Sequence, residues 1–355
     1  MGRRLLRAAL HGACRAGAWH RHSAELDWVL RGTERQPRIL GTDQLLLADA
    51  QDRHRGLHRG RMKEFAFRML PPLSVSFKPE AGITRQIVER YDLLVEVAGT
   101  EKVVEQVSPV ADLVYAVHMP FNEAPLGRLN YAATDADYRH RALDRIKQCL
   151  RAASGNFANA EIAVIHGAPS RWAPHEHAGA REGDYELFIE GLRELAEHAA
   201  DAGLLLVLEN NNAYWIDAQG KFSWRDSSEN PDTRYYACTP PHWLRSWEDA
   251  AHENLKLCLD TAHACTFAHT IDDYAERTQA LLSYFDRPEA IAHVHWNGHL
   301  AFEPEGRVDE HLPVGDGTIP TEVHRRIKYL GVRPTLEHYQ GEAALERELE
   351  YIRGL

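Results

Sequence analysis

The chain lacks several features that would place it in familiar classes of protein. It has no uninterrupted apolar run near the roughly 20 residues that a membrane-spanning helix requires, so no membrane protein is expected. Its five cysteines are odd in number and include no CxxC pair, which predicts free thiols in a reducing compartment and a cytoplasmic protein. A Gly-rich GxGxxG turn is also missing after the first apolar run, which disfavours an open dinucleotide-binding sheet.

Lysine is absent from residues 1–61, which hold 12 Arg and 6 acidic residues. We expect this segment to be a basic, Arg-rich and poorly ordered extension, or sequence upstream of a start at Met62, without a functional residue. Since the whole chain carries a net charge of −11, residues 62–355 are strongly acidic. Attraction to phosphate depends on clustered Lys and Arg, so an acidic body disfavours general nucleic-acid binding.

Short apolar runs alternate with amphipathic segments from Met62 onward. The eight runs cover residues 73–77, 93–97, 113–118, 162–166, 204–209, 255–260, 290–295 and 334–337. Alternation of strand and helix predicts a parallel sheet, and eight such units fit the α/β class as a (β/α)₈ TIM barrel of typically about 250 residues. An open doubly wound sheet is the alternative.

The segments between the runs have helical periodicity. Apolar side chains recur at spacings of three and four through Tyr185, Phe188, Leu192 and Leu195, which predicts an amphipathic helix. Thr134, with Asp137 three positions later, predicts a capping box at the start of another helix, and residues 342–353 are expected to form the last one.

Imidazole and carboxylate side chains follow most of the apolar runs. They are His118, His166, Glu209, Asp260 with His263, His295 and Glu337, and Asp309 with His311 stands between the last two runs. In a parallel barrel these ends open on one face, and a buried charge there costs several kcal/mol unless it is paired or coordinated. One such residue would more often be a hydrogen-bonded core residue, but the whole set predicts a metal site. Histidine and carboxylate ligands without thiolate suit Zn²⁺, Mn²⁺ or Fe²⁺ better than Ca²⁺ or Mg²⁺.

In this order the motifs resemble the xylose isomerase-like TIM-barrel superfamily, over about residues 72–340. That superfamily includes the endonuclease IV-type AP endonucleases (AP endonuclease family 2) and sugar-phosphate isomerases and epimerases. The matching pieces are His118-Met119-Pro120, His166-Gly167, Glu209-Asn210, Asp260-Thr261-Ala262-His263, His295-Trp296-Asn297, Asp309-Glu310-His311, Gly315-Asp316-Gly317 and Glu337.

The resemblance to the endonuclease branch implies up to three zinc ions per chain. The first set of ligands would be His118, His166 and Glu209. The second would share Glu209 and add Asp260, His295 and Glu337. The third would be His263, Asp309 and His311. In the isomerase branch only the second set holds a metal, and the two glutamates move a proton on either side of a carbonyl.

The pair Asp309 and His311 favours a multinuclear hydrolase of phosphoester bonds in a sugar-phosphate or nucleotide-like substrate, because a one-metal isomerase has little need for it. Glu209 and Glu337 are the expected catalytic residues. A mononuclear sugar isomerase or epimerase is the alternative. The resemblance also extends to multi-iron enzymes that oxidatively modify peptides, and a non-catalytic, metal-stabilised binding module is a fourth hypothesis.

The chain departs from the endonuclease pattern in its loops. Residues 98–101 and 121–124 lack the basic and aromatic side chains with which those enzymes enter DNA, and the first run ends at Lys78 instead of the family's histidine. DNA is therefore a disfavoured partner, and a small molecule is expected.

Candidate substrate-binding residues are Lys78, Asn211, Trp224, Asn297 and His299. Asn297 and His299, together with His293, could instead support metal-bound imidazoles through hydrogen bonds. The long loop 211–241 carries Tyr214, Trp215, Trp224, Tyr235 and Tyr236, and Trp172 stands in the loop before it. These aromatic residues are expected either to cover the substrate as a lid or to pack the loop against the barrel.

Overall fold

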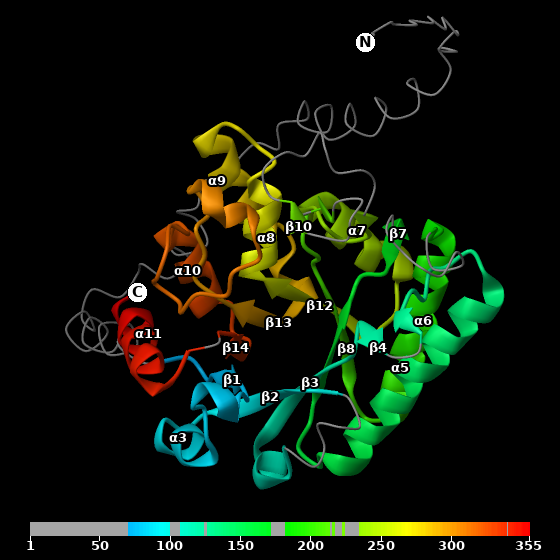
Figure 1. Ribbon diagram of the computed structural model, residues 1–355, viewed down its shortest axis with the longest axis horizontal. Helices are drawn as coiled ribbons and strands as arrows, with labels where there is room; N and C mark the ends of the chain where they lie inside the picture. The colour runs from blue at the N-terminus through cyan, green and yellow to red at the C-terminus, as the bar shows by residue number, and fades with distance from the viewer. Residues whose placement is uncertain are drawn as a thin grey trace, which may run out of the picture. The chain divides into compact units, whose positions relative to one another are not determined.

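The apolar runs of the sequence form a closed barrel of eight parallel strands in the computed structural model (Figure 1). In chain order the strands are β1 (Ser74–Ser76), β2 (Leu94–Ala98), β3 (Val114–His118), β6 (Ile162–His166), β8 (Leu205–Glu209), β12 (Leu255–Asp260), β13 (Ile291–Trp296) and β14 (Pro334–Leu336). Each pairs with its neighbour along the chain, and β1 closes the ring against β14. The barrel is confirmed and the open sheet is excluded.

The structure describes residues 70–99, 107–123, 126–171, 182–213, 215–216, 222–223, 234–338 and 340–355. The basic extension over residues 1–61 and the aromatic residues Trp172, Tyr214 and Trp224 lie outside these ranges. In the described part of the chain, no helix is both long and apolar enough to cross a membrane. The four cysteines described there, Cys149, Cys238, Cys258 and Cys265, are free thiols.

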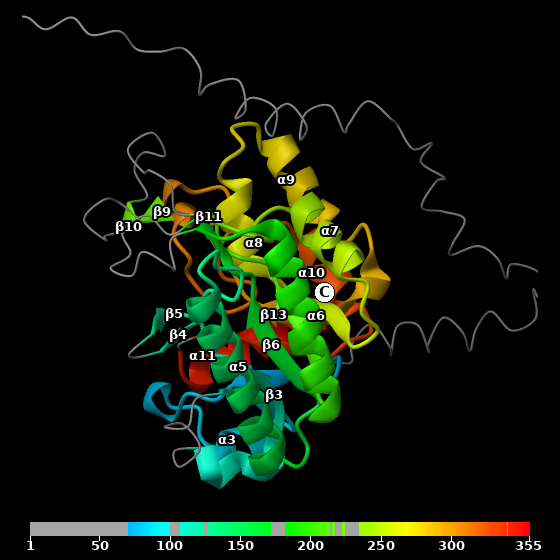
Figure 2. The ribbon, with the colours of Figure 1, turned by 90° about the vertical axis from the view of Figure 1, so that its right-hand side faces the viewer.

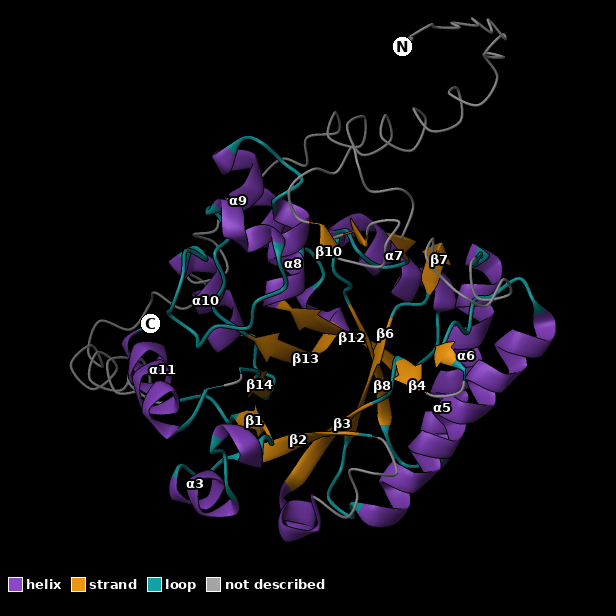
Figure 3. Cartoon of the chain, viewed as in Figure 1, coloured by secondary structure: helices purple, strands orange, loops and turns teal. Residues whose placement is uncertain are grey.

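Helices surround the barrel on its outer side (Figure 3). The α-helices are α3 (Arg85–Arg90), α5 (Ala136–Asn156), α6 (Tyr185–Asp201), α7 (Pro240–Ala250), α8 (Thr261–Ala268), α9 (Tyr274–Ser283), α10 (Thr321–Lys328) and α11 (Glu342–Gly354). The 3₁₀ helices are η2 (Pro79–Ala81), η3 (Ser108–Leu113), η5 (Pro288–Ala290) and η6 (Pro304–Arg307). Between β2 and β3 the described residues include η3.

The helical periodicity of the sequence is confirmed with one correction. In α6 the side chains of Phe188, Leu192 and Leu195 are buried at the predicted spacing. The capping box at Thr134 is wrong, because the carboxylate of Asp135 accepts the hydrogen bond from the backbone N–H of Tyr138 at 2.9 Å. Two adjacent residues could cap this helix, and Asp is at least as good a cap as Thr.

Alternation along the strands decides which side chains face the barrel interior. A small apolar cluster inside the barrel includes Ala116, Val164, Val207 and Cys258. Two positions further along the same strands stand His118, His166, Glu209 and Asp260. Since residues two apart share a face of the sheet, the polar side chains point into the same interior, one layer closer to the C-terminal ends of the strands.

Short antiparallel pairs lie beyond the strand ends. They are β4 (Asn122–Glu123) with β5 (Gly127–Arg128), β7 (Pro169–Arg171) with β11 (Arg234–Tyr235), and β9 (Trp215–Ile216) with β10 (Phe222–Ser223). The labels of β4, β5, β9, β10 and β11 lie together on one side of the barrel in Figure 2, at the left of that view.

A buried pair ties the last helix to the loop after β13. His338 Nε2 lies 3.0 Å from Glu348 Oε2, and both side chains have no exposed surface. The other oxygen of Glu348 accepts a hydrogen bond from the backbone N–H of Val314 at 2.7 Å. Glu348 therefore joins α11, the segment after β14 and the loop that carries Asp309 and His311.

We expect Glu348→Ala to lower the free energy of unfolding by about 3 kcal/mol, because it leaves two buried polar groups without their partner. Glu348→Gln should cost only about 1 kcal/mol, since the amide oxygen can still accept from Val314. Urea unfolding followed by circular dichroism measures both. Glu350→Ala, at an exposed position of the same helix, is the matched control. Equal stability of the Glu348→Ala and Glu350→Ala variants would contradict this role.

Candidate metal centre

The nine predicted ligands converge at the C-terminal ends of the strands. His118, His166, Glu209 and Asp260 are the last residues of β3, β6, β8 and β12. His295 is in β13, Glu337 follows β14, and His263 is in the first turn of α8. Asp309 and His311 come from the loop between β13 and β14. The contacts within the cluster fall into three groups.

The first group is His118, His166 and Glu209. The Nε2 atoms of both histidines lie 3.0 Å from Glu209 Oε2. They are also only 3.2 Å from each other. Two imidazole nitrogens and a carboxylate oxygen that face one point form the donor set of a metal site.

The second group is Glu209, Asp260 and His295, and Glu337 lies beside it. His295 Nδ1 is 3.0 Å from Glu209 Oε1, 3.5 Å from Asp260 Oδ2 and 3.2 Å from Glu337 Oε2. Glu337 Oε2 is buried, and its contact with His295 Nδ1 does not have the geometry of a hydrogen bond, so this oxygen accepts none from the described residues. A buried carboxylate oxygen without a donor is costly, and a cation at this point would satisfy it.

The third group contains His263 and His311, with Asp260 and Asp309 as its carboxylates. His311 Nε2 is 3.1 Å from Asp309 Oδ1, and His263 Nε2 is 3.4 Å from Asp309 Oδ2. Asp260 also caps α8, because its Oδ1 accepts from the backbone N–H of His263 at 2.9 Å. The first turn of α8 therefore brings Asp260 and His263 to the same side of the cluster.

Hydrogen bonds outside the cluster fix the tautomer of each imidazole. The Nδ1 atoms of four histidines donate to oxygen acceptors: His118 to Met119 O at 3.0 Å, His166 to Asn211 Oδ1 at 3.1 Å, His263 to Asn210 O at 2.7 Å and His311 to Glu337 O at 3.0 Å. An oxygen that only accepts requires the proton on Nδ1, so the Nε2 lone pairs point into the cluster. This is the arrangement expected of metal-binding histidines.

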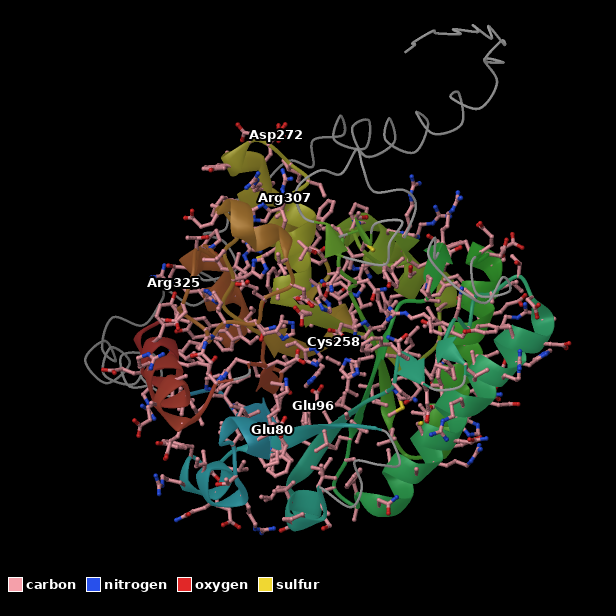
Figure 4. The ribbon with its side chains drawn as sticks, in the orientation of Figure 1. Glu80, Glu96, Cys258, Asp272, Arg307 and Arg325 are labelled. Carbon is pink, nitrogen blue, oxygen red and sulfur yellow. The ribbon has the colours of Figure 1, made fainter. Side chains whose placement is uncertain are left out.

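Glu96 in β2 performs the same task for the fifth histidine and was missed in the sequence. Its Oε1 lies 2.9 Å from His295 Nε2, which leaves Nδ1 of that ring for the cluster. Glu96 also contacts His293 Nε2 at 2.8 Å and accepts from Thr335 Oγ1 at 3.0 Å. Figure 4 shows Glu96 near the middle of the barrel, whereas Asp272 and Arg325 lie outside it. The sequence offered one signal for Glu96, which is an acidic residue inside the apolar run 93–97.

Charges within the cluster strongly shift its titration. Burial would raise the pKa of Glu209, but the neighbouring imidazoles, His166 and His295 foremost, hold it well below its usual value. Burial would lower the pKa of His311, but Glu337 and Asp309 raise it to about 9. Burial prevails at His166 and lowers its pKa to about 4. Protons on some imidazoles therefore compensate the negative charge of the carboxylates. Divalent cations could take the place of these protons.

A cavity of about 850 Å³ opens beside the cluster. Glu209, Asp309, Glu337 and Lys78 are among the residues that line it. Burial lowers the pKa of Lys78, against the opposing effect of Glu337 and Glu96. The predicted substrate-binding position of Lys78 is thus in the cavity wall, within the field of the carboxylates.

The other predicted substrate-binding residues occupy different places. Asn211 lines the cavity, but its amide N–H groups donate to Gly167 O and Tyr236 O, both at 2.9 Å, while its oxygen holds His166. Asn297 is buried with its side-chain amide beside the carboxylate of Asp260. His299 is fully buried, with Nε2 2.8 Å from Val308 O. In this structure Asn211 and Asn297 support predicted ligands, and Trp224 lies outside the described residues.

The fold and the cluster together define a (β/α)₈ barrel with a candidate metal centre at the C-terminal ends of its strands. The chain belongs to the family described as xylose isomerase-like TIM barrel, whose sequence pattern matches residues 78–355. The resemblance seen in the sequence is therefore confirmed. No curated protein matches the chain in sequence.

Solved structures share the fold at low sequence identity. A D-tagatose 3-epimerase-like protein is 20% identical with a TM-score of 0.52, over 80% of this chain and 98% of that one. The 3-keto-D-glucoside 4-epimerase YcjR from E. coli is 15% identical, with a TM-score of 0.52, over 80% and 100%. The TTHB071 protein from Thermus thermophilus, in a structure described as "soaking with ZnCl2", is 21% identical, with a TM-score of 0.52, over 79% and 98%. These identities establish a common fold and no common activity.

We expect Glu96→Gln to weaken metal binding by about 10- to 100-fold, the usual cost of losing a hydrogen-bond partner of a ligand histidine. Competition with a chromogenic chelator measures the affinity, and thermal unfolding checks that the variant is folded. Glu80→Gln is the matched control, because Glu80 lines the same cavity but is exposed. Equal affinities in the two variants would show that Glu96 does not act through His295.

Proposed function

We propose that the protein is a multinuclear metal-dependent hydrolase that cleaves phosphoester bonds in a sugar-phosphate or nucleotide-like substrate. One observation carries this proposal. The third group, with His263, Asp309 and His311, lies beside the second group. The second group, which is Glu209, Asp260, His295 and Glu337, would suffice for a single metal. A one-metal enzyme would not need two further imidazoles and a carboxylate with their ring nitrogens fixed toward the same cavity.

The three groups would hold up to three divalent cations, with Zn²⁺ the best fit to their nitrogen and oxygen donors and Mn²⁺ or Fe²⁺ as alternatives. The chemistry that such cations supply is Lewis-acid polarisation of a phosphoryl oxygen and activation of water near neutral pH. The residues present fit this role, because the unsatisfied Glu337 Oε2 and the inward nitrogen lone pairs are suitable ligand atoms for a cation.

Glu209 is placed to bridge two of the groups. Its Oε2 faces His118 and His166, while its Oε1 faces His295 at 3.0 Å and His263 Nδ1 at 3.3 Å. The carboxylate is almost fully buried, so its position is fixed by these contacts. We assign to Glu209 the role of positioning the reacting water relative to the metal ions.

Lys78, a cation among the carboxylates of the cavity wall, is proposed to contact the substrate. It lies in a cavity wall that also contains Glu80, Glu96 and Glu337. An ammonium group there would neutralise a phosphoryl oxygen of the substrate and orient it. The volume of about 850 Å³ falls in the range of small-molecule sites, which supports a sugar phosphate or a nucleotide-like substrate over DNA.

A mononuclear sugar isomerase or epimerase is the second candidate. The second group favours it, because Glu209 Oε1 and Glu337 Oε2 both face His295 Nδ1, at 3.0 and 3.2 Å. Two glutamates around one metal could remove and return a proton on either side of a carbonyl carbon. The number of bound ions separates this candidate from the first.

Protein purified without chelator should contain about two to three divalent ions per chain, the number that the three groups can hold. Asp309→Ala and His311→Ala should each lose about one ion, measured by inductively coupled plasma mass spectrometry, because they break the third group. Glu310→Ala, at the exposed position between them, is the control. A single ion per chain that His311→Ala leaves in place would favour the isomerase. Stoichiometric iron with a visible absorption band would favour an oxidative enzyme.

The metal-loaded protein should release phosphate or alcohol from small phosphoesters, such as sugar phosphates or bis(p-nitrophenyl) phosphate, and should cut abasic-site DNA poorly. Glu209→Gln should lower kcat by at least about 100-fold, since it removes the carboxylate placed between two groups of ligands. The Glu310→Gln variant should keep full activity. Undiminished activity of Glu209→Gln would refute the cluster as the active site, and efficient nicking of abasic DNA would refute the small-molecule substrate.

A further inference from the structure

Asn212 is a partly buried residue in the loop after β8, and it lines the cavity beside the third group of candidate ligands. Its side-chain Nδ2 donates to Asp309 Oδ2 at 3.1 Å. The same carboxylate oxygen lies 3.4 Å from His263 Nε2, and both of these residues line the cavity as well. The amide of Asn212 therefore contacts an oxygen that the third group would offer to a cation.

The orientation of this amide follows from its partner. An ionised carboxylate only accepts hydrogen bonds, so the branch of the amide that faces Asp309 is the N–H group. The carbonyl oxygen is the branch that remains. Asn212 Oδ1 is buried and has no hydrogen-bond partner among the described residues. A buried carbonyl oxygen without a partner is destabilising, and a cation beside it would satisfy it.

The backbone next to Asn212 is tied to the helix that carries His263. The N–H of Ala213 donates to Thr266 Oγ1 in α8 at 2.9 Å. The hydroxyl of Thr266 in turn donates to the backbone carbonyl of His263 at 2.7 Å. One side chain thus joins the loop and the first turns of α8. Asn212 and His263 are positioned together and need little ordering when a cation binds.

The chemistry of an amide oxygen suits the third group. The two carboxylates of this group, Asp260 and Asp309, already carry the charge that neutralises one divalent cation. A neutral oxygen adds a donor without adding a buried charge that would need a further partner. Carbonyl oxygens are common ligands of divalent cations, and together with imidazole they are compatible with Mn²⁺ or Fe²⁺ as well as Zn²⁺.

We propose that Asn212 Oδ1 is a ligand of the cation in the third group, while Asn212 Nδ2 orients Asp309 in the same site. The proposal adds a tenth residue to the nine candidate ligands. It rests on the proposed multinuclear centre, because it assigns a ligand to the third cation of that centre. It does not depend on which bond of the substrate the enzyme cleaves.

The first test is a titration of the metal-free, full-length protein with Zn²⁺ in competition with a chromogenic chelator. The binding step of the third ion is the step that His311→Ala removes. Asn212→Leu keeps the branched shape of the side chain without its polar atoms. It should weaken that step by about 10- to 100-fold, which is the cost of losing even a group that only supports a ligand. The other binding steps should not change.

Asn212→Asp separates a ligand from a residue that acts only through Asp309. This variant keeps an oxygen for the cation but loses the N–H group that donates to Asp309. If Oδ1 is a ligand, Asn212→Asp should bind the third ion at least as tightly as the wild type. A loss as large as that of Asn212→Leu would show that Asn212 only positions Asp309, and it would overturn the proposed ligand. Asn212→Asp also serves as the second variant if Asn212→Leu does not fold.

Co²⁺ in place of Zn²⁺ gives a spectroscopic readout, because the visible absorption of this ion depends on its ligands and geometry. The absorption of the third ion should change in Asn212→Leu. Asn156→Leu and Asn156→Asp are the matched controls, since Asn156 is exposed at the end of α5 and outside the cavity wall. Both controls should keep the affinities and the absorption of the wild type. Thermal unfolding of the metal-free proteins checks that every variant is folded.

The outcomes distinguish this inference from the proposed function. Unchanged binding of the third ion in Asn212→Leu, with that ion still lost in His311→Ala, would refute the ligand and leave the multinuclear centre standing. If His311→Ala removes no ion, the third site does not exist and both proposals fail. Weaker binding of the third ion in Asn212→Leu, in a protein that hydrolyses no phosphoester, would support the ligand and refute the proposed reaction.

Discussion

The carboxylate of Glu209, almost fully buried at the end of β8, is the group on which the rest of the site depends. A buried charge of this kind is tolerated only with partners, and here its two oxygens face imidazoles from four other elements. Those imidazoles in turn face further carboxylates. The result is a layer of imidazoles and carboxylates across the C-terminal end of the barrel. The contacts between these side chains, and not apolar packing, hold the layer together.

This layer is positioned by hydrogen bonds that lie behind it. Each candidate ligand histidine has one ring nitrogen fixed by a backbone carbonyl, an amide oxygen or, for His295, the carboxylate of Glu96. The loop with Asp309 and His311 is held by paired hydrogen bonds between Gly298 and Leu312, and by Glu348 below it. A Cβ at Gly298 would stand 2.2 Å from Pro313 O, so only glycine allows this approach. Fixed ligands need no reorganisation when a cation or substrate binds, which is the usual basis of catalytic preorganisation.

The cavity wall combines two kinds of charge. The carboxylates belong to the candidate metal centre and its surroundings, while Lys78 and Arg128 come from the loop after β1 and from the hairpin after β3. The loops of a TIM barrel vary independently of the strands, so the same ligand layer can serve different substrates. The loops, and not the barrel strands, would then decide the substrate.

The sequence alone determined the strands, the barrel and the nine candidate ligands. Six of the eight apolar runs end in an imidazole or a carboxylate. The period of two along a strand sends those side chains into the interior. Local competition misled the prediction at Thr134, where the next residue caps the helix. Glu96 could be assigned only from the tertiary structure, because its partners His293 and His295 lie 197 and 199 residues further along the chain. Sequence periodicity carries no information on contacts between residues so far apart in the chain.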